Sequence, residues 1–241
     1  MRRISHYSTM VFITSDNGGV NGFSNQGLRG KKSHLWEGGH RVPGIFRWPG
    51  KIEAGTECKV PVCGVDLLPT ICEFTGGKVP TDRKLDGTSL ASLLTGKSET
   101  LKRETPLYWF FYRLNPSLAL RDGRWGLIAD TSDAQRPKTH SLIREDMAFI
   151  KTSRPEKFLL FDLAAELPQQ KDLSNEYPEV FERLKDIHDR LDMAIQSTIK
   201  LIEECLVTND AYYFDEVSLP IQITEDSEMY SFYRYLLGVT A

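Results

Sequence analysis

Two apolar runs in the N-terminal part of the chain predict buried β-strands. The first covers residues 9–15 with the sequence Thr-Met-Val-Phe-Ile-Thr-Ser, and the second covers residues 44–48 with Gly-Ile-Phe-Arg-Trp. Both are rich in residues that favour β-structure. A helix is expected to start after Asp66 as its cap and to end at Gly76, and a shorter helix is expected over residues 90–94. This alternation of strands and helices predicts an α/β unit.

A pattern of short strands joined by turns follows. Strands are predicted at residues 107–112, 118–121, 124–128 and 158–163. Asp122 and Gly123 supply the turn of a hairpin between the second and the third of these strands. A helix is then predicted from Pro178, with an apolar stripe at helical spacing made by Val180, Leu184, Ile187, Leu191 and Ile195. Together these elements predict a small antiparallel sheet packed against a helix.

The chain therefore divides into three expected parts. Residues 1–103 form the α/β unit, residues 104–196 form a small α+β subdomain, and residues 197–241 are an extension with no predicted architecture. The extension is rich in Tyr and Phe, which argues against a purely disordered tail.

Composition narrows the class of protein. The apolar content of 40% is ordinary for a globular chain of 241 residues, and a formal charge of −3 provides no basic field for nucleic acid. No apolar run approaches the roughly 20 residues of a membrane span. Residues 1–7 lack the apolar stretch of a signal peptide. Four cysteines are too sparse for a disulfide scaffold; Cys58 and Cys63 have the option of pairing, but free thiols are favoured.

Candidate chemistry lies at the end of the first predicted strand. In open α/β folds, ligands bind beyond the carboxyl ends of the strands, and Asp16 and Asn17 stand at that position. Their hard oxygen donors suit Ca²⁺, with Mg²⁺ as the alternative, and Gly18 lets the backbone turn sharply beside an ion. The competing interpretation is a simple turn, because Asp, Asn and Gly all tolerate tight backbone geometry.

Four motifs in this region resemble those of sulfatases of the alkaline-phosphatase-like superfamily. That family carries D-N-G after a central strand, then L-R-x-x-K, E-G-G-x-R-x-P and W-P-G. The corresponding segments here, in the same order and spacing, are residues 16–18, 28–32, 37–43 and 48–50. Later landmarks extend the resemblance to about residue 196.

The resemblance implies a fold and a set of site residues. It implies an α/β alkaline-phosphatase-like sulfatase core, present in part, followed by a small antiparallel sheet with a C-terminal helix. Asp16 and Asn17 correspond to metal ligands, and Lys32 corresponds to the catalytic, substrate-binding lysine that contacts the sulfate group. His40 is a weaker candidate for a substrate contact. Glu37 and Arg41 are expected to pair and to lock the loop structurally, with Gly38 and Gly39 between them.

The resemblance also indicates what this sequence does not contain. The family's nucleophile is a formylglycine made from a Cys or Ser in a C/S-x-P-S/T-R motif, and none of Cys58, Cys63, Cys72 and Cys205 begins such a motif. We therefore expect the C-terminal part of a sulfatase, inactive alone, that needs a complementing N-terminal segment.

The leading functional hypothesis is a sulfuric ester hydrolase with a sulfate ester substrate, for which a sulfated carbohydrate is one candidate. The alternatives are a phosphatase or phosphonate hydrolase of the same superfamily, which the five histidines disfavour, and a non-catalytic remnant or binding protein. The compartment is left open, since the family occurs in the periplasm, in lysosomes and outside the cell.

Overall fold

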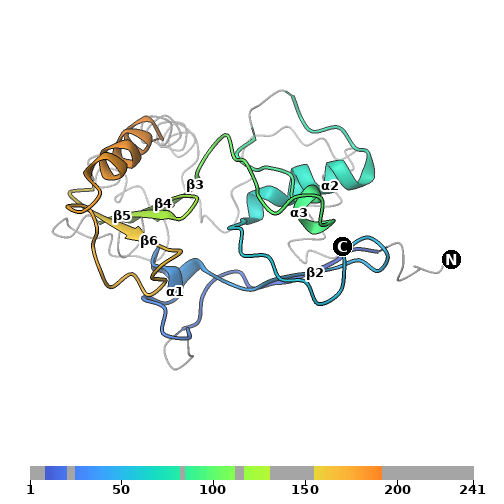
Figure 1. Cartoon of the computed structure of the whole chain (residues 1–241), viewed down its shortest axis with the longest axis horizontal. Coiled ribbons are helices and arrows are strands. Elements are labelled where there is room, and N and C mark those ends of the chain that lie inside the picture. Colours follow the sequence, from blue (N-terminus) through green and yellow to red (C-terminus); the bar gives the residue numbers. More distant parts are fainter. Residues whose placement is uncertain (1–8, 21–24, 82–84, 112–116, 131–154, 192–241) are drawn as a thin grey trace, which may run out of the picture.

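The protein has two sheets, each with helices packed beside it (Figure 1). The computed structural model describes residues 9–20, 25–81, 85–111, 117–130 and 155–191. A two-stranded sheet and two helices form one half, and a four-stranded sheet with a longer helix forms the other half. The predicted extension, residues 197–241, lies outside the described residues.

The two predicted N-terminal strands form, in shorter form, but the prediction that they are buried is wrong: most of their residues are exposed, because among the described residues they make a two-stranded sheet on their own. β1 (Val11–Thr14) pairs antiparallel with β2 (Gly44–Arg47). Phe12 and Phe46 lie opposite each other in the ladder, and their rings stack with centroids 4.4 Å apart. Within the described residues β1 has one ladder partner, so its other edge is open.

The predicted helix after Asp66 is also confirmed. A 3₁₀ turn, η1 (Gly64–Asp66), leads into α2 (Leu67–Thr75), and Gly76 ends α2 in the left-handed conformation with φ 70°. The shorter helix is α3 (Ala91–Leu94). The expected cap differs in detail: Asp66 stands at the N-cap position, directly before α2, but makes no side-chain hydrogen bond to that helix's own backbone N–H groups.

Asp66 is instead the centre of a buried polar junction. Its carboxylate accepts hydrogen bonds from the backbone N–H groups of Cys63 at 2.8 Å and Thr88 at 2.9 Å. The guanidinium of Arg103 donates to both carboxylate oxygens, at 2.7 and 2.5 Å. Asp66 is fully buried, so these contacts replace the water that the charge would otherwise need. The junction joins three segments that lie far apart in the sequence.

The predicted antiparallel sheet is confirmed. Its strands are β3 (Leu107–Phe111), β4 (Ser117–Asp122), β5 (Trp125–Asp130) and β6 (Lys157–Asp162), hydrogen-bonded in chain order. The turn between β4 and β5 consists of Gly123 and Arg124, one residue later than predicted, because Asp122 pairs with Trp125 in the ladder; Gly123 has φ 59° in this turn. The predicted C-terminal helix starts at Pro178 and is described through residue 191; Ile195 lies outside the described residues.

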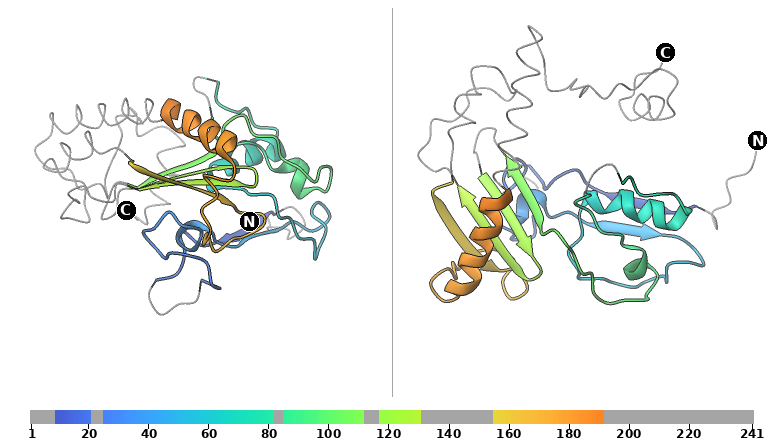
Figure 2. Two further views of the ribbon diagram at one scale, coloured as in Figure 1. Left: turned by 60° about the vertical axis from the view of Figure 1, so that its left-hand side comes forward. Right: turned by 90° about the horizontal axis from the view of Figure 1, so that it is seen from above.

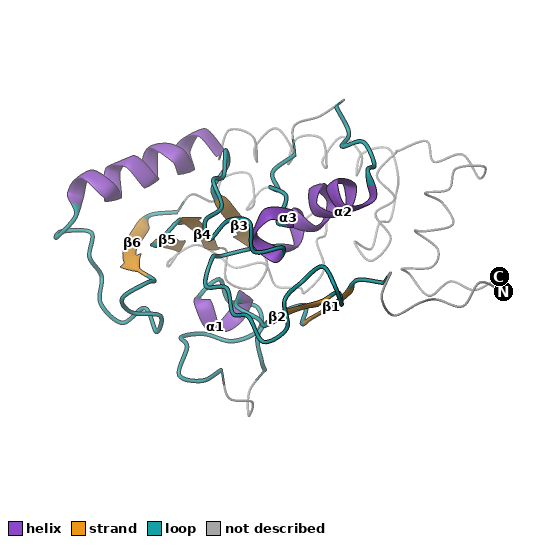
Figure 3. Cartoon of the chain, turned by 45° about the vertical axis from the view of Figure 1, so that its right-hand side comes forward, coloured by secondary structure: helices purple, strands orange, loops and turns teal. Residues whose placement is uncertain are grey.

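The four-stranded sheet is covered on both faces, as the alternation of its side chains requires. On one face, residues such as Leu118, Leu120 and Leu160 pack around Leu184 of the C-terminal helix. On the other face, Ala119, Ile128 and Phe161 pack against Leu35, which comes from the loop before α1 (Glu37–His40). Figures 2 and 3 show the C-terminal helix on one side of the sheet and α1 on the other.

Cys58, Cys63 and Cys72 are free thiols, so the expectation of unpaired cysteines is confirmed for these three residues, while Cys205 lies outside the described part of the chain. Among the described residues, no helix combines the length and the apolar content that a membrane span requires.

Candidate active site

The structure brings the predicted site residues to one cavity of about 960 Å³ between the two halves of the protein. Asp16, Asn17, Lys32 and His40 all line it, although they come from different parts of the N-terminal loop region. Further lining residues come from β3, β4 and the segment before η1, among them Trp109, Arg121, Cys58, Val60 and Cys63. The predicted roles of Asp16, Asn17, Lys32 and His40 stay predictions.

Backbone hydrogen bonds position Lys32 beside the end of β1. The N–H of Lys32 donates to the carbonyl of Gly19 at 2.9 Å, and the N–H of Gly18 donates to the carbonyl of Gly39 at 2.8 Å. The N–H of Gly38 donates to the carbonyl of Arg29 at 2.7 Å. The segment carrying Lys32 is therefore fixed on one side to the Asp-Asn-Gly turn and on the other to α1.

This arrangement needs the glycines of α1, as the sequence predicts. A Cβ atom on Gly39 would lie 1.9 Å from the carbonyl oxygen of His34, and one on Gly38 would lie 2.6 Å from that of Arg29. Both clashes are with backbone carbonyl oxygens, which cannot move aside as the end of a flexible side chain could. The two glycines thus allow the loop and α1 to approach closely.

Asp16 and Asn17 present oxygen atoms at the rim of the cavity. Asp16 is exposed and Asn17 is half-buried, and the Ser15 hydroxyl donates to the carbonyl of Asn17 at 3.0 Å. Their carboxylate and amide oxygens fit Ca²⁺ or Mg²⁺ by donor type. In the described part of the chain, no group of three or more His, Cys, Asp or Glu side chains is placed to bind a metal ion. These two residues therefore offer part of a coordination shell.

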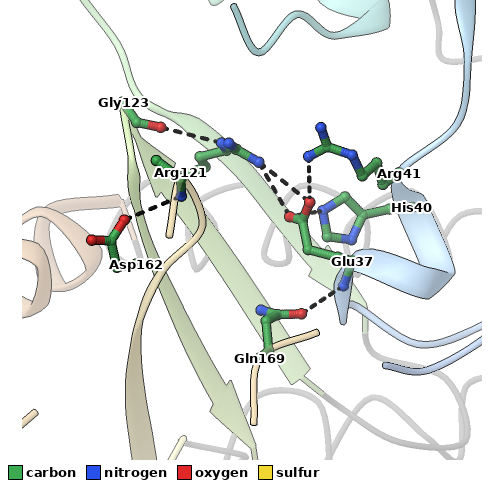
Figure 4. A network of polar contacts seen from close by, with 8 residues as sticks. Glu37, His40, Arg41, Arg121, Gly123, Asp162 and Gln169 are labelled. Atoms are coloured by element: carbon green, nitrogen blue, oxygen red, sulfur yellow. Dashed lines mark hydrogen bonds and ion pairs between the residues drawn. The ribbon is translucent and has the colours of Figure 1, made fainter. Parts of the chain in front are cut away.

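A single buried carboxylate, Glu37, organises the sheet side of the cavity (Figure 4). Its Oε2 accepts a hydrogen bond from Arg41 Nη1 at 2.8 Å, which confirms the expected pair. Arg121 Nη1 lies 3.3 Å from both of its oxygens, and His40 Nε2 lies 3.6 Å from Oε1. Burial raises the pKa of Glu37, but the contacts with His40 and Arg41 and the charge of Arg121 outweigh it, and the pKa falls from 4.5 to about 2.

Arg121 is a site residue that the sequence does not predict. It lies on β4, 84 residues from Glu37, and its side chain is 11% exposed. Burial lowers the pKa of this guanidinium, and the negative charge of Glu37 opposes that effect. The one signal in the sequence is an arginine beside the predicted Asp-Gly turn, which is equally typical of a solvated strand end.

His40 faces the cavity next to an aromatic ring of β3. Its imidazole lies 4.6 Å from the ring of Trp109, measured between centroids. Its Nδ1 is buried and has no hydrogen-bond partner among the described residues. His34 also lines the cavity.

The loop after β6 anchors α1 from the opposite direction. Gln169 Oε1 accepts a hydrogen bond from the backbone N–H of Glu37 at 2.7 Å (Figure 4). The backbone carbonyl of Gln169 accepts from Arg29 Nη1 at 3.1 Å, and the guanidinium of Arg29 lies 3.5 Å from the centre of the Trp36 ring. The four-stranded half therefore contributes directly to the position of the loop that carries Lys32.

Comparison with known proteins defines the class. A family model described as "N-sulphoglucosamine sulphohydrolase, C-terminal" matches residues 27–200. The chain belongs to this family, and the sulfatase resemblance found in its motifs is confirmed.

Individual relatives agree with this class. Steryl-sulfatase from Rattus norvegicus is 30% identical over 217 residues, which cover 82% of this chain and 36% of the rat protein. Steryl-sulfatase from Homo sapiens is 40% identical over 106 residues, 40% of this chain and 18% of the human protein. The chain thus spans about a third or less of the length of these relatives.

The fold class is confirmed by a solved structure. The crystal structure of Ps i-CgsB superposes with a TM-score of 0.60 at 25% identity, covering 78% of this chain and 36% of that chain. The predicted fold class is therefore confirmed: part of an α/β sulfatase core, followed by a small antiparallel sheet and a C-terminal helix. The division at residues 103 and 196 stays a prediction.

Proposed function

We propose that this chain forms the sulfate-binding wall of a sulfatase active site, in a protein that hydrolyses sulfuric esters. One observation carries the proposal: Asp16, Asn17 and Lys32 line a single cavity, with Lys32 held beside the end of β1 by the hydrogen bond from its own N–H to Gly19. This juxtaposition places two oxygen donors and an ammonium group around the same space.

Lys32 would bind the sulfuryl group of the substrate. When the S–O bond to the alcohol breaks, its electron pair leaves with the alcohol oxygen, and an ammonium group beside the anionic sulfuryl group stabilises the transition state electrostatically. The Lys32 side chain is exposed and lines the cavity, and its backbone is fixed, so the ammonium group extends into the cavity from a defined point of the chain.

Asp16 and Asn17 would supply two oxygen ligands for Ca²⁺, or for Mg²⁺, out of the six to eight that Ca²⁺ takes. The ion, when bound, supplies a Lewis acid at the sulfuryl oxygens. The nucleophile, a formylglycine by resemblance, would come from polypeptide that the printed sequence does not contain.

The relatives support a sulfate ester and leave its alcohol part open. The matched proteins include steryl-sulfatases and arylsulfatases, each named for the substrate class of that protein. A sulfated carbohydrate stays one candidate for the substrate. No relative or structure described above supports the phosphatase alternative.

A complementing N-terminal segment is part of the proposal. Of the large apolar side chains that are exposed among the described residues, all but Tyr177 lie within residues 11–79. Ile13 and Ile45 on the outer face of the β1–β2 sheet are 57% and 54% exposed, and Leu68 and Ile71 on α2 are each 47% exposed. Together with the open edge of β1, these faces fit a further strand and further apolar cover.

Sulfate binding tests the role of Lys32. Inorganic sulfate is titrated calorimetrically into the wild-type chain and into Lys32→Ala and Lys51→Ala, the latter being an exposed lysine away from the cavity. Loss of a hydrogen bond from a charged donor is expected to weaken binding by about tenfold or more in Lys32→Ala. Equal affinities for all three proteins would contradict the proposed site.

Turnover is a separate expectation. The 241-residue chain alone should not hydrolyse a chromogenic aryl sulfate, because electrostatic groups without a nucleophile leave only a small residual rate. Metal-dependent turnover well above that of Lys32→Ala would show that this chain provides its own nucleophile.

A further inference from the structure

We propose that Glu37, His40, Arg41 and Arg121 form a second oxyanion subsite on the sheet side of the cavity, so that the substrate carries another anionic group besides the scissile sulfate. The ligand class is an acidic sulfated carbohydrate, in which a carboxylate or a second sulfate occupies this subsite. The inference rests on the proposed function, because the first sulfate is assigned to the side of Lys32.

The charge of the cluster is unbalanced. One buried carboxylate, Glu37, faces two guanidinium groups, those of Arg41 and Arg121. Over the whole described lining, four Lys or Arg side chains stand against two carboxylates, Asp16 and Glu37. A cavity with such an excess of positive charge concentrates anions.

Arg121 is held more loosely than a purely structural arginine in the same protein. Its Nη1 lies 3.3 Å from each Glu37 oxygen, whereas Arg103 contacts the Asp66 oxygens at 2.7 and 2.5 Å through two different nitrogens. In the Asp66–Arg103 pair, one carboxylate accepts two hydrogen bonds from one guanidinium. The Glu37 carboxylate is shared between Arg41 and Arg121, so Arg121 can still donate to another acceptor.

The donors of Arg121 can be counted. A guanidinium has five N–H groups in a fixed planar fork. Nε donates to the carbonyl of Gly123 at 3.2 Å, and Nη1 contacts Glu37 (Figure 4). Among the described residues, Nη2 has no acceptor, although the side chain is only 11% exposed and lines the cavity. The two N–H groups of Nη2 are thus available at the cavity to donate hydrogen bonds to an oxyanion.

His40 adds a second unmet group beside Arg121. Its Nδ1 is buried without a partner in the described part of the chain, and its ring is fixed against Trp109. A buried ring nitrogen without a hydrogen bond costs free energy that a polar ligand would recover. A sugar bearing an anionic group provides hydroxyl and oxyanion partners for both residues.

Calorimetric titration of the full chain with three probes tests the subsite. The probes are a methyl glucoside 6-sulfate, the corresponding 2,6-disulfate, and a methyl glucuronide 2-sulfate, which offers a carboxylate as the second anion. We expect the wild-type chain to bind at least one doubly anionic probe about tenfold more tightly than the monosulfate. Which of the two it prefers identifies the second group as sulfate or carboxylate.

Variants separate the subsite from the sulfate site. Arg121→Gln should remove the preference for the doubly anionic probe and leave monosulfate affinity within about twofold, while Arg124→Gln, on the same sheet but paired with Asp162, should change neither. Lys32→Ala should weaken all three probes. If Arg121→Gln unfolds, Arg121→Lys replaces it, and the preference should fall because the single nitrogen of lysine cannot contact Gly123, Glu37 and a ligand as the three nitrogens of arginine do.

Results that contradict the subsite can be distinguished from results that contradict the proposed function. Equal affinity of the wild-type chain for all probes, or a preference that survives replacement of Arg121, overturns the subsite while the role of Lys32 stands. Affinities that are insensitive to Lys32→Ala overturn the proposed function itself, and the subsite with it.

Discussion

At the scale of single residues, Glu37 makes stability depend on pH. Its pKa is about 2 in the folded protein and 4.5 in the unfolded chain, so its contribution is complete above pH 4.5 and is lost as the pH falls from there towards 2. The difference corresponds to about 3 kcal/mol. In Glu37→Gln, urea unfolding should show a loss of about that size at pH 7 and a flatter decline below pH 4.5.

Glu176→Gln is the matched control for this measurement. Glu176 pairs with Lys171 at the surface, where both side chains are more than half exposed, and such pairs contribute little. Its replacement should change the free energy of unfolding by less than about 0.5 kcal/mol. Parallel pH curves for the wild-type chain and Glu37→Gln would mean that these contacts do not lower the pKa of Glu37.

Part of the cluster of contacts around Glu37 can be predicted from the sequence. Glu37 and Arg41 are four residues apart on either side of two glycines, so their pairing is local and predictable. Arg121 and Gln169 reach Glu37 from 84 and 132 residues away, and no local pattern encodes that approach. For the same reason, the excess charge at the cavity becomes visible only in the folded chain.

At the scale of elements, the Asp66–Arg103 pair should hold η1, α2 and the segment before α3 together. Arg103→Ala leaves the fully buried Asp66 carboxylate without its counter-charge, which is expected to cost about 3 to 5 kcal/mol. Arg183→Ala breaks an exposed pair with Asp122 and should cost less than about 1 kcal/mol. Denaturant unfolding followed by tryptophan fluorescence measures both; similar losses would refute the junction.

Elements with a strong repeating pattern are the ones that the sequence predicts. The apolar strands β4 and β5, the glycine of their turn and the apolar stripe after Pro178 each carry a local signal. The helix α1 does not, because two of its four residues are glycines that weaken helix propensity. It forms because the carbonyls of the loop and the side chain of Gln169 bind its backbone. Likewise, the sequence predicts that Asp66 caps a helix, and only the folded structure reveals its ion pair with Arg103.

At the scale of the whole molecule, the exposed apolar faces should make the isolated chain self-associate. They lie on β1, β2 and α2, and β1 has an open edge, a combination that favours association. Sedimentation velocity across a concentration series should show association that decreases in the double variant Ile13→Lys, Leu68→Lys. Tyr177→Lys, at an exposed site in the other half, is the control and should not change it. If the wild-type chain is monomeric at all concentrations, the exposed apolar faces do not drive self-association and the prediction is wrong.

The hydrogen bond between Gln169 and Glu37 implies an order of events during synthesis. These residues are separated by 132 positions, and at about 5 to 20 residues per second the second is made on the order of 10 s after the first. Until then, α1 lacks the acceptor for its first N–H, and Arg121 arrives only part-way through that interval. The segment that presents Lys32 is made before the residues that hold α1 in place, and it is expected to become fixed only after they have been made.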